Sequence, residues 1–175
     1  SKELEFLNMP SVTLDFTHEK GKLTINGMDT MELLISANAG EPPKPIAKIA
    51  SGGELSRIML ALKSVIAEKD NIPTMIFDEI DTGVSGRAAQ KIGIKLSEIG
   101  KIRQVLCVTH LAQIAVMADN HLLIEKNVID DKTSTSVKQL DFDGRKYEVA
   151  RIMGGDNITE LMLENATELL NSKNN

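Results

Sequence analysis

The sequence is poor in the residues on which several common kinds of site depend. It holds one cysteine, Cys107, so an internal disulfide is excluded, and this thiol lies in an apolar run that is typical of a small buried residue in a reducing compartment. Tryptophan is missing and aromatic residues make up 3%, so stacking of bases on aromatic side chains is not expected to be the main mode of any nucleic-acid contact. The three histidines are scattered and have no zinc-ligand spacing.

Long apolar runs and an excess of positive charge are missing as well. No apolar run approaches the roughly 18 residues that a membrane span needs, and no signal-peptide pattern opens the chain, so we expect a cytoplasmic protein without a membrane partner. The formal net charge is −5, so any binding to DNA must come from a local patch or from another part of the protein. With 175 residues and 42% hydrophobic residues, the chain is long enough for one domain with a real core.

The order of apolar and polar residues predicts a mixed α/β chain. Residues 12–16 and 22–25 alternate and Asn26-Gly27 is a turn signal, which together predict a small antiparallel β unit that continues to residue 37. Residues 38–48 contain three prolines and predict a loop. The later elements expected are helices at about 51–69, 87–99, 111–117, 145–153 and 158–170 and strands at about 74–77, 103–108, 120–126 and 134–140.

The stretch after Pro73 contains the first candidate site. A short, mostly apolar strand at residues 74–77 runs directly into two adjacent carboxylates, Asp78 and Glu79. Burying an unpaired carboxylate costs several kcal/mol, so such a strand is expected to present the pair to a cation or ligand at its carboxyl end. This is the form of a Walker-B element, in which Asp78 holds Mg²⁺, usually through water, and Glu79 orients the water that attacks a γ-phosphate. A strand that runs into an acidic turn without a ligand is the alternative.

A serine and two glycines at the start of an amphipathic helix form the second candidate site. Ser51 is suited to cap the helix, but a cap alone does not require Gly52 and Gly53 behind it, because glycine in a first turn weakens a helix. Two glycines at this point let a phosphate approach bare backbone N–H groups at the positive end of the helix dipole. The alternative is an N-cap with a flexible entry.

A second apolar strand, at residues 103–108, ends in Thr109 and His110. The carboxyl ends of parallel strands share one edge of a sheet, so we expect His110 to face the same ligand as Asp78 and Glu79. A histidine with a structural role is the alternative. The pair Gly154-Gly155 follows a helix instead of preceding one, and it therefore predicts a helix C-cap and turn, not a second phosphate loop.

These motifs occur in the order found in the C-terminal lobe of ABC-type ATPase heads, which the chain resembles. Within that superfamily, three strings resemble the RecN family, the SMC-like DNA-repair ATPases of bacteria: Ala-Ser-Gly-Gly-Glu-Leu-Ser-Arg, Ile-Phe-Asp-Glu-Ile-Asp-Thr-Gly-Val-Ser-Gly and Val-Thr-His-Leu-Ala-Gln-Ile-Ala. The resemblance covers residues 10–170 and implies an α/β fold, the C-terminal half of a P-loop ATPase head with a mostly parallel sheet flanked by helices. Residues 1–9 would then end a returning coiled-coil arm or linker, and residues 171–175 would be a disordered tail.

The resemblance also implies roles for the residues at the helix start. Ser51, Gly52, Gly53 and Glu54 match the signature motif, which in this superfamily contacts the γ-phosphate of ATP held by the other protomer. Arg57 matches the arginine of the signature helix, and its role is left open.

The acidic strand end and the second strand end receive roles in the same way. The resemblance makes Asp78 the Walker-B aspartate that holds Mg²⁺, Glu79 the catalytic carboxylate, and His110 the catalytic switch histidine that touches the γ-phosphate. Asp81 and Ser85 fall in the D-loop, and Ser85 stands at a position that ABC proteins usually fill with aspartate.

A P-loop is not present in this sequence. No G-x-x-x-x-G-K-[ST] string occurs, so the groups that cradle the β- and γ-phosphates are missing, and this chain alone is expected neither to bind ATP tightly nor to hydrolyse it. The resemblance implies three partners: the N-terminal Walker A lobe of the same protein, a second head in an ATP-sandwiched homodimer, and DNA, bound by the full-length protein during double-strand-break repair and recombination at the bacterial nucleoid. The alternatives are another SMC-type head, an ABC-transporter half-head and a non-enzymatic Rossmann-like interaction module.

Overall fold

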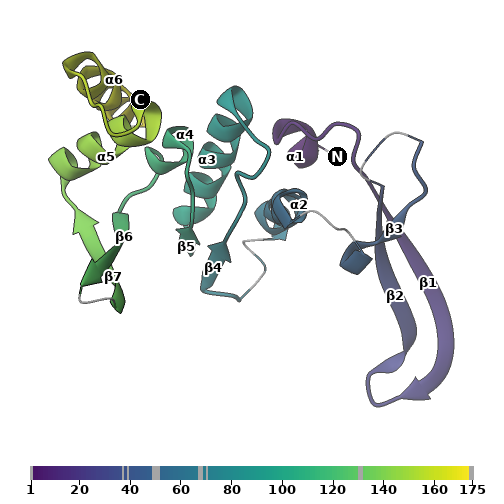
Figure 1. Cartoon of the computed structure of the whole chain (residues 1–175). Coiled ribbons are helices and arrows are strands. Elements are labelled where there is room, and N and C mark those ends of the chain that lie inside the picture. The colour runs from purple at the N-terminus through teal and green to yellow at the C-terminus, as the bar shows by residue number, and fades with distance from the viewer. Residues whose placement is uncertain are drawn as a thin grey trace. The chain divides into compact units, whose positions relative to one another are not determined.

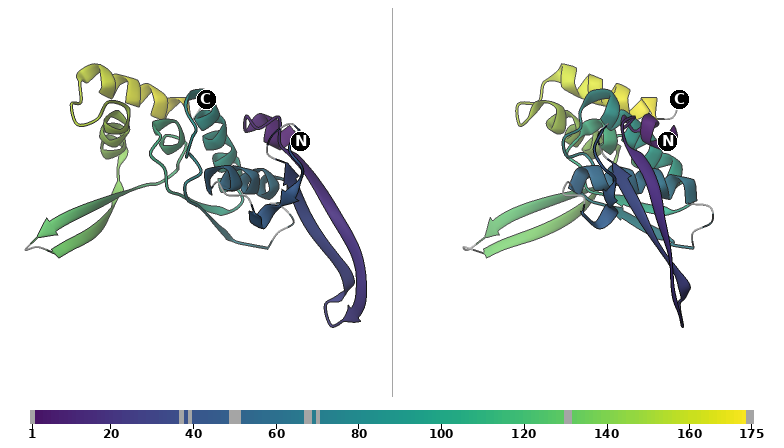
Figure 2. Two further views of the ribbon diagram at one scale, coloured as in Figure 1. Left: turned by 45° about the vertical axis from the view of Figure 1, so that its right-hand side comes forward. Right: turned by 90° about the vertical axis from the view of Figure 1, so that its right-hand side faces the viewer.

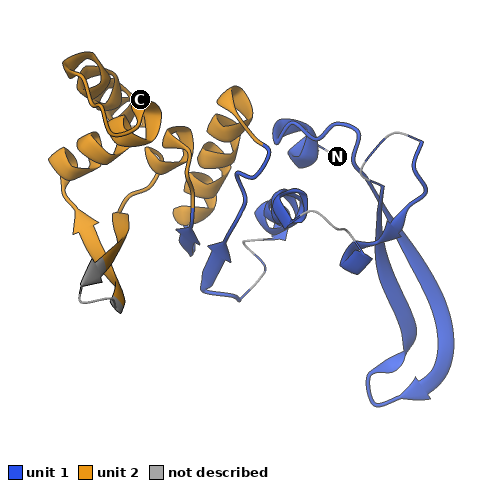
Figure 3. Ribbon diagram, in the orientation of Figure 1, with its two compact units in different colours: residues 1–83, 102–108 blue, residues 84–101, 109–175 orange. Residues whose placement is uncertain are grey.

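The computed structural model describes residues 2–36, 38, 40–48, 52–66, 69, 71–129 and 132–173. Contacts within the chain divide it into two compact units, coloured blue and orange in Figure 3. The first unit holds Ser1–Gly83 and Ile102–Val108, and the second holds Val84–Lys101 and Thr109–Asn175. The lobe expected over residues 10–170 thus contains two compact units.

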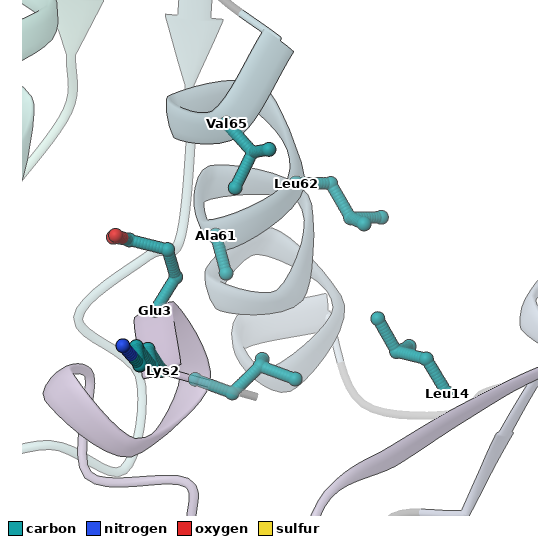
Figure 4. A pocket seen from close by; sticks show the side chains of 7 residues that line it. Lys2, Glu3, Leu14, Ala61, Leu62 and Val65 are labelled. Carbon is teal, nitrogen blue, oxygen red and sulfur yellow. The ribbon is translucent and has the colours of Figure 1, made fainter.

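Two helices of the first unit pack against each other. α1 (Lys2–Phe6) lies on α2 (Gly52–Ile66), and Ser64 of α2 donates a hydrogen bond of 3.3 Å to the carboxylate of Glu3. A pocket of about 360 Å³ opens between α1, the start of the following strand and the C-terminal half of α2 (Figure 4). It is lined by Lys2, Glu3, Leu4, Leu14, Ala61, Leu62 and Val65. The pocket therefore lies beside the opposite end of α2 from the glycines at its start.

A long antiparallel hairpin makes up much of the first unit (Figure 1). β1 (Thr13–Thr24) pairs with β2 (Gly27–Ser36), where the sequence predicted two strands before the turn instead of one. Gly27 has a φ of 99°, in the left-handed region that glycine adopts freely, which confirms the turn predicted at Asn26-Gly27. The short strand β3 (Lys44–Pro45) adds to β2, and the 3-10 helix η1 (Ile46–Lys48) follows it within the expected loop.

The hairpin is amphipathic. Its apolar face is buried at the base and becomes exposed toward the turn. The strand register places Phe16 opposite Leu33 and His18 opposite Met31 on one face. Ile35 at the base is 2% exposed, whereas Phe16 is 61% exposed and Met31 is 66% exposed. Figure 2 shows the hairpin extending away from α1 and α2 of its own unit. Its outer half has no apolar cover among the described residues.

The first unit also contains the two strands that the sequence predicted to be parallel. β4 (Thr74–Phe77) and β5 (Gln104–Cys107) pair in parallel, with Phe77 opposite Cys107, and the N–H of Val108 donates to the carbonyl of Phe77 at 3.0 Å. The carboxyl ends of the two strands therefore lie side by side, as predicted.

The described residues of the second unit form four helices and a hairpin. Its elements are α3 (Gly86–Gly100), α4 (Ala112–Ala115), β6 (His121–Ile129), β7 (Lys132–Leu140), α5 (Phe142–Gly154) and α6 (Glu160–Ser172). The core of this unit joins α4, α5 and α6 through Ala112, Val116, Val149, Ala150, Ala166 and Leu170. α6 extends to Ser172, into the range predicted as a tail, while residues 174 and 175 lie outside the described residues.

The sequence supplies capping residues at both ends of α5 and at the start of α6. Asp141 caps α5 by accepting a hydrogen bond from the N–H of Gly144, and Thr159 caps α6 by accepting one from Met162. Gly155 has a φ of 76° and donates to the carbonyl of Arg151, which confirms the predicted C-cap.

The prediction of a mostly parallel sheet was wrong for the described part of the chain. Its strands form three small sheets, of which β4–β5 is parallel and the other two are antiparallel. Only two residues separate β1 from β2 and β6 from β7, and so short a connection allows antiparallel pairing alone, because parallel pairing requires a crossover such as the one that contains α3. No described helix is both long enough and apolar enough to span a membrane.

Candidate functional site

The acidic turn, defined here as residues 78–83, follows β4 directly. Asp78 and Glu79 are exposed, whereas Ile80 between them and the rest of the turn is 0% exposed and anchors the turn in the unit. The N–H of Thr82 donates to the carbonyl of Glu79 at 3.1 Å, and the N–H of Glu79 donates to Oδ1 of Asp78 at 3.0 Å. Both carboxylates are exposed at the carboxyl end of β4, so they do not incur the several kcal/mol that burial of an unpaired carboxylate would cost.

Glu79 has an unusual backbone conformation. Its φ is 57°, in the left-handed region, which costs an L-residue other than glycine roughly 1–2 kcal/mol. A residue in this region persists when the surrounding structure determines its conformation, and such residues occur often at functional sites. The side chain of Glu79 is therefore aimed by a backbone that the rest of the unit must hold in place.

Two hydrogen bonds connect the first turns of α2 to the backbone of the acidic turn. The hydroxyl of Ser56 donates to the carbonyl of Asp78 at 3.1 Å, and the guanidinium of Arg57 donates to the carbonyl of Thr82 at 2.9 Å. These acceptors lie on either side of Glu79. Burial lowers the pKa of Arg57 while the carboxylate of Glu54 raises it, and its ordinary value is high enough that the group stays a cation.

The two glycines at the start of α2 allow this close contact. A Cβ on buried Gly53 would lie 2.8 Å from Cβ of Thr82, 2.9 Å from its carbonyl oxygen and 3.0 Å from the carbonyl oxygen of Glu79. A Cβ on Gly52 would lie 2.7 Å from Oε2 of Glu79. Packing within this chain therefore requires glycine at position 53, a reason additional to the phosphate access inferred from the sequence. Ser51, the first residue of the predicted motif, lies outside the described residues.

Negative charge gathers where β4 and β5 end. Burial, together with the smaller effects of the carboxylates of Asp81 and Asp78, raises the pKa of the Cys107 thiol to about 12. The thiol at the end of β5 is therefore neutral at physiological pH and is not a candidate nucleophile.

The remaining predicted residues, His110 and Ser85, belong to the second unit. His110 is exposed just before α4, and the hydroxyl of Thr109 accepts a hydrogen bond of 3.1 Å from the N–H of Leu111. Ser85 precedes α3 in an extended conformation, and its carbonyl accepts from the N–H of Ala88 at 3.2 Å. That His110 meets the acidic turn stays a prediction.

Arg145 holds the segment after His110 in the second unit. Its guanidinium donates to the carbonyl of Ala118 at 2.7 Å and contacts those of Val116 and Asp119 at 3.5 Å. Gly93 of α3 packs closely against α4, since a Cβ there would lie 2.9 Å from the carbonyl oxygen of Gln113. The turn at the end of α4 is thereby fixed from two helices.

Sequence reasoning passed over Ser56 and Thr82 and left the role of Arg57 open. Sequence motifs are recognised by side chains that carry chemistry, whereas these contacts end on backbone carbonyls, which every residue has. The spacing of Ser56 and Arg57 in the first turns of a helix gives no sign of what they bind.

The acidic turn fits a magnesium ion that is shared with phosphates. Mg²⁺ in phosphate sites is usually held by one or two carboxylates together with water and substrate oxygens, and exposed Asp78 offers one such carboxylate. Within the described ranges no group of three or more potential metal ligands occurs, so a site made of this chain's side chains alone is not supported.

Comparison with solved structures identifies the class of fold. The SMC head domain of Pyrococcus yayanosii matches with a TM-score of 0.62 and 20% identity over 87% of this chain and 28% of that chain. A second SMC ATPase, described by its ATP-driven dimerization and DNA-stimulated activation, matches with a TM-score of 0.52 and 19% identity over 87% of this chain and 88% of that one. The fold is therefore that of an SMC-type ATPase head.

Comparison with curated sequences identifies the particular protein to which the chain is related. It is 50% identical over 145 residues to the DNA repair protein RecN of Halalkalibacterium halodurans, and 48% identical over 149 residues to that of Bacillus subtilis. These matches cover 83% and 85% of this chain, so the chain is a homologue of the RecN family of DNA repair proteins. It spans about a quarter of the length of these relatives, 26% of each. No family model matches the chain.

Proposed function

We propose that this chain supplies one half of an ATP-hydrolysing site in the head of a RecN-like DNA repair protein. The observation that carries the proposal is the contact between the start of α2 and the acidic turn, which brings two of the three predicted motifs together in one compact unit. The homology supports a RecN-type head over the transporter and non-enzymatic alternatives.

The reaction is transfer of the γ-phosphoryl group of ATP to water. Such transfer is catalysed mainly by positioning and charge stabilisation, so its site can be divided among parts that meet only when nucleotide is bound. Asp78 would hold Mg²⁺, which neutralises charge on the phosphate oxygens when bound. Glu79 would accept a hydrogen bond from the attacking water and orient it toward phosphorus. His110 would donate to a γ-phosphate oxygen.

The start of α2 would act on a second nucleotide. Its N–H groups and the positive end of its dipole would face the γ-phosphate of ATP held by another head, so that two heads enclose two ATP molecules. ATP is then part of the interface, and its hydrolysis weakens the dimer. In the full-length protein this cycle would accompany binding of DNA in the bacterial cytoplasm.

A complementation experiment tests the proposal. The chain and an N-terminal P-loop lobe of a RecN relative are assayed separately and mixed, and Mg-ATP hydrolysis is expected in the mixture alone, because this sequence contains no P-loop. The control mixture carries a P-loop lobe whose Walker A lysine is replaced by alanine. Hydrolysis by this chain alone, or none in the mixture when the two lobes bind each other, would count against the proposal.

A second variant separates dimer closure from nucleotide binding. Ser51→Arg places a bulky cation where the second head's phosphate is proposed to sit, so ATP-dependent dimerisation should be lost. The reassembled head is the complex of this chain with the N-terminal P-loop lobe. Its binding of ATP should persist, because the P-loop and Asp78 act on the nucleotide of their own head.

A further inference from the structure

The strained backbone of Glu79 requires something to hold it. An isolated turn would relax from the left-handed region, and the internal bonds of the acidic turn, from Thr82 to Glu79 and from Glu79 to Asp78, remain possible in several turn geometries. The additional restraint must come from outside the turn. It comes from the burial of Ile80 and from two hydrogen bonds donated by the first turns of α2.

The contacts from α2 bracket Glu79 along the chain. Ser56 binds the carbonyl of Asp78, immediately before Glu79, and Arg57 binds the carbonyl of Thr82, three residues after it. The backbone of Gly53 packs against Thr82 and the carbonyl of Glu79, and no room for a methyl group is left between them. With the peptide units before and after it fixed, Glu79 has little freedom to change its backbone angles.

We propose that Arg57 is a positioning residue, which holds the acidic turn so that the carboxylate of Glu79 is correctly placed for hydrolysis. This role rests on the proposed function of Glu79 and fills the role that the sequence leaves open. Arginine suits it because a charged donor makes a stronger hydrogen bond to a carbonyl than a neutral donor does.

The same contact makes the start of α2 and the acidic turn move as one body. In a two-headed assembly the start of α2 would touch the partner's nucleotide while Glu79 acts on its own head's nucleotide. A displacement of α2 on dimer closure would therefore be passed through Arg57 to Glu79. Hydrolysis in one site would then depend on closure of the other.

Kinetics of the reassembled head test the role. Arg57→Met keeps an unbranched apolar stem and removes the donor, and kcat should fall about 10-fold or more with KM for ATP changed less than about threefold, since small misplacements of a catalytic group cost up to about 100-fold. Arg57→Lys, which retains a charged donor, should recover part of kcat. Arg87→Met, at an exposed arginine of α3, is the matched control and should leave kcat unchanged.

Hydrogen exchange tests the same contact without reference to activity. In the 175-residue chain, Arg57→Met should speed exchange of the Thr82 amide about 10-fold, as expected for loss of one hydrogen bond that restrains the turn. Amides of α5 and α6 should keep their protection and so report that the variant is folded. If Arg57→Met does not fold, the comparison is made with Arg57→Lys.

Each outcome bears on the role of Arg57. Unchanged exchange at residues 78–83, or unchanged kcat in Arg57→Met, overturns it. If the wild-type lobes bind each other but their mixture does not hydrolyse ATP, the proposed function fails, and the exchange result still decides whether Arg57 restrains the turn. A rise in KM with constant kcat would also overturn the role, because it would place Arg57 in nucleotide binding instead.

Discussion

Arg57 donates a hydrogen bond of 2.9 Å to the backbone carbonyl of Thr82, a residue 25 positions further along the chain. This bond joins the helix that begins with two glycines to the turn that carries two exposed carboxylates. It makes the conformation of Glu79 a property of the whole first unit and not of the turn alone. The predictions below therefore concern the turn, its contact with α2 and the second unit.

The first prediction concerns backbone strain at position 79. Glu79→Gly should be more stable than Glu79→Ala by about 0.5–1 kcal/mol. The left-handed conformation costs alanine about 1–2 kcal/mol, and the greater freedom of glycine in the unfolded chain offsets about 0.4–1 kcal/mol of this. Urea unfolding of the two variants measures the difference.

Position 78 provides the control for this comparison. Asp78 is not among the described residues with positive φ, so Asp78→Gly should be less stable than Asp78→Ala. The same order at both positions would mean that the turn does not hold Glu79 in a left-handed conformation. Both Glu79 variants should lack turnover in the reassembled head, whichever is the more stable.

The second prediction concerns the space at Gly53. Gly53→Ala should destabilise the chain by about 1–3 kcal/mol, because the added methyl group would lie 2.8–3.0 Å from backbone and side-chain atoms of Thr82 and Glu79. Gly100→Ala is the matched control, since a Cβ there meets no described atom within 4 Å. That substitution should be neutral or stabilise the chain by up to about 1 kcal/mol. Equal effects of the two substitutions would show that α2 and the turn do not pack closely.

The third prediction concerns the pKa of His121 in the second unit. Burial lowers this pKa, the nearby guanidinium of Arg145 lowers it further, and the carboxylate of Glu148 raises it. Arg145→Gln should therefore raise the pKa of His121, and Glu148→Gln should lower it. Titration of the histidine ring signals by NMR measures both changes, and a shift in the same direction for the two variants would contradict the assignment.

The lowered pKa of His121 also predicts a dependence of stability on pH. As pH falls below about 6.5, the ordinary pKa of histidine, the unfolded chain takes up a proton that the folded chain does not, so the free energy of unfolding decreases until the folded pKa is reached. The wild-type chain should lose stability relative to His121→Asn over this range. A relative gain of stability on acidification would contradict the direction of the shift.

Elements with strong local signals were predictable from the sequence. The turn at Asn26-Gly27 and the C-cap at Gly155 follow from residue types within a few positions of each other. The parallel pairing of β4 with β5 was expected from two apolar strands joined through a helix. The close packing of the two glycines against the turn that carries Asp78 and Glu79 was not predicted, because the family resemblance assigns the glycines to the nucleotide of a second head.

The interactions that position the site could not be predicted in this way. The contact of Arg57 with Thr82 ends on a carbonyl group, which carries no sequence signal, and the left-handed φ of Glu79 depends on packing with a helix distant in sequence. The mostly parallel sheet was implied by the family resemblance, and neither the resemblance nor the pattern of two apolar strands specifies which further strands of this chain join them. Which strands pair in a sheet depends on tertiary contacts, and the local periodicity of apolar residues does not reveal those contacts.

Replacement of Glu79 by glutamine tests the central claim most directly. Glutamine keeps the size and backbone of the residue but cannot accept a proton, so turnover of ATP by the reassembled head should fall about 10²–10⁴-fold. ATP binding and the ATP-dependent dimer should both be retained, because the P-loop, Asp78 and the start of α2 are unchanged. Measured by steady-state hydrolysis and by the mass of the complex with ATP, this combination is the result that the account predicts. Turnover close to that of the wild-type head would contradict it.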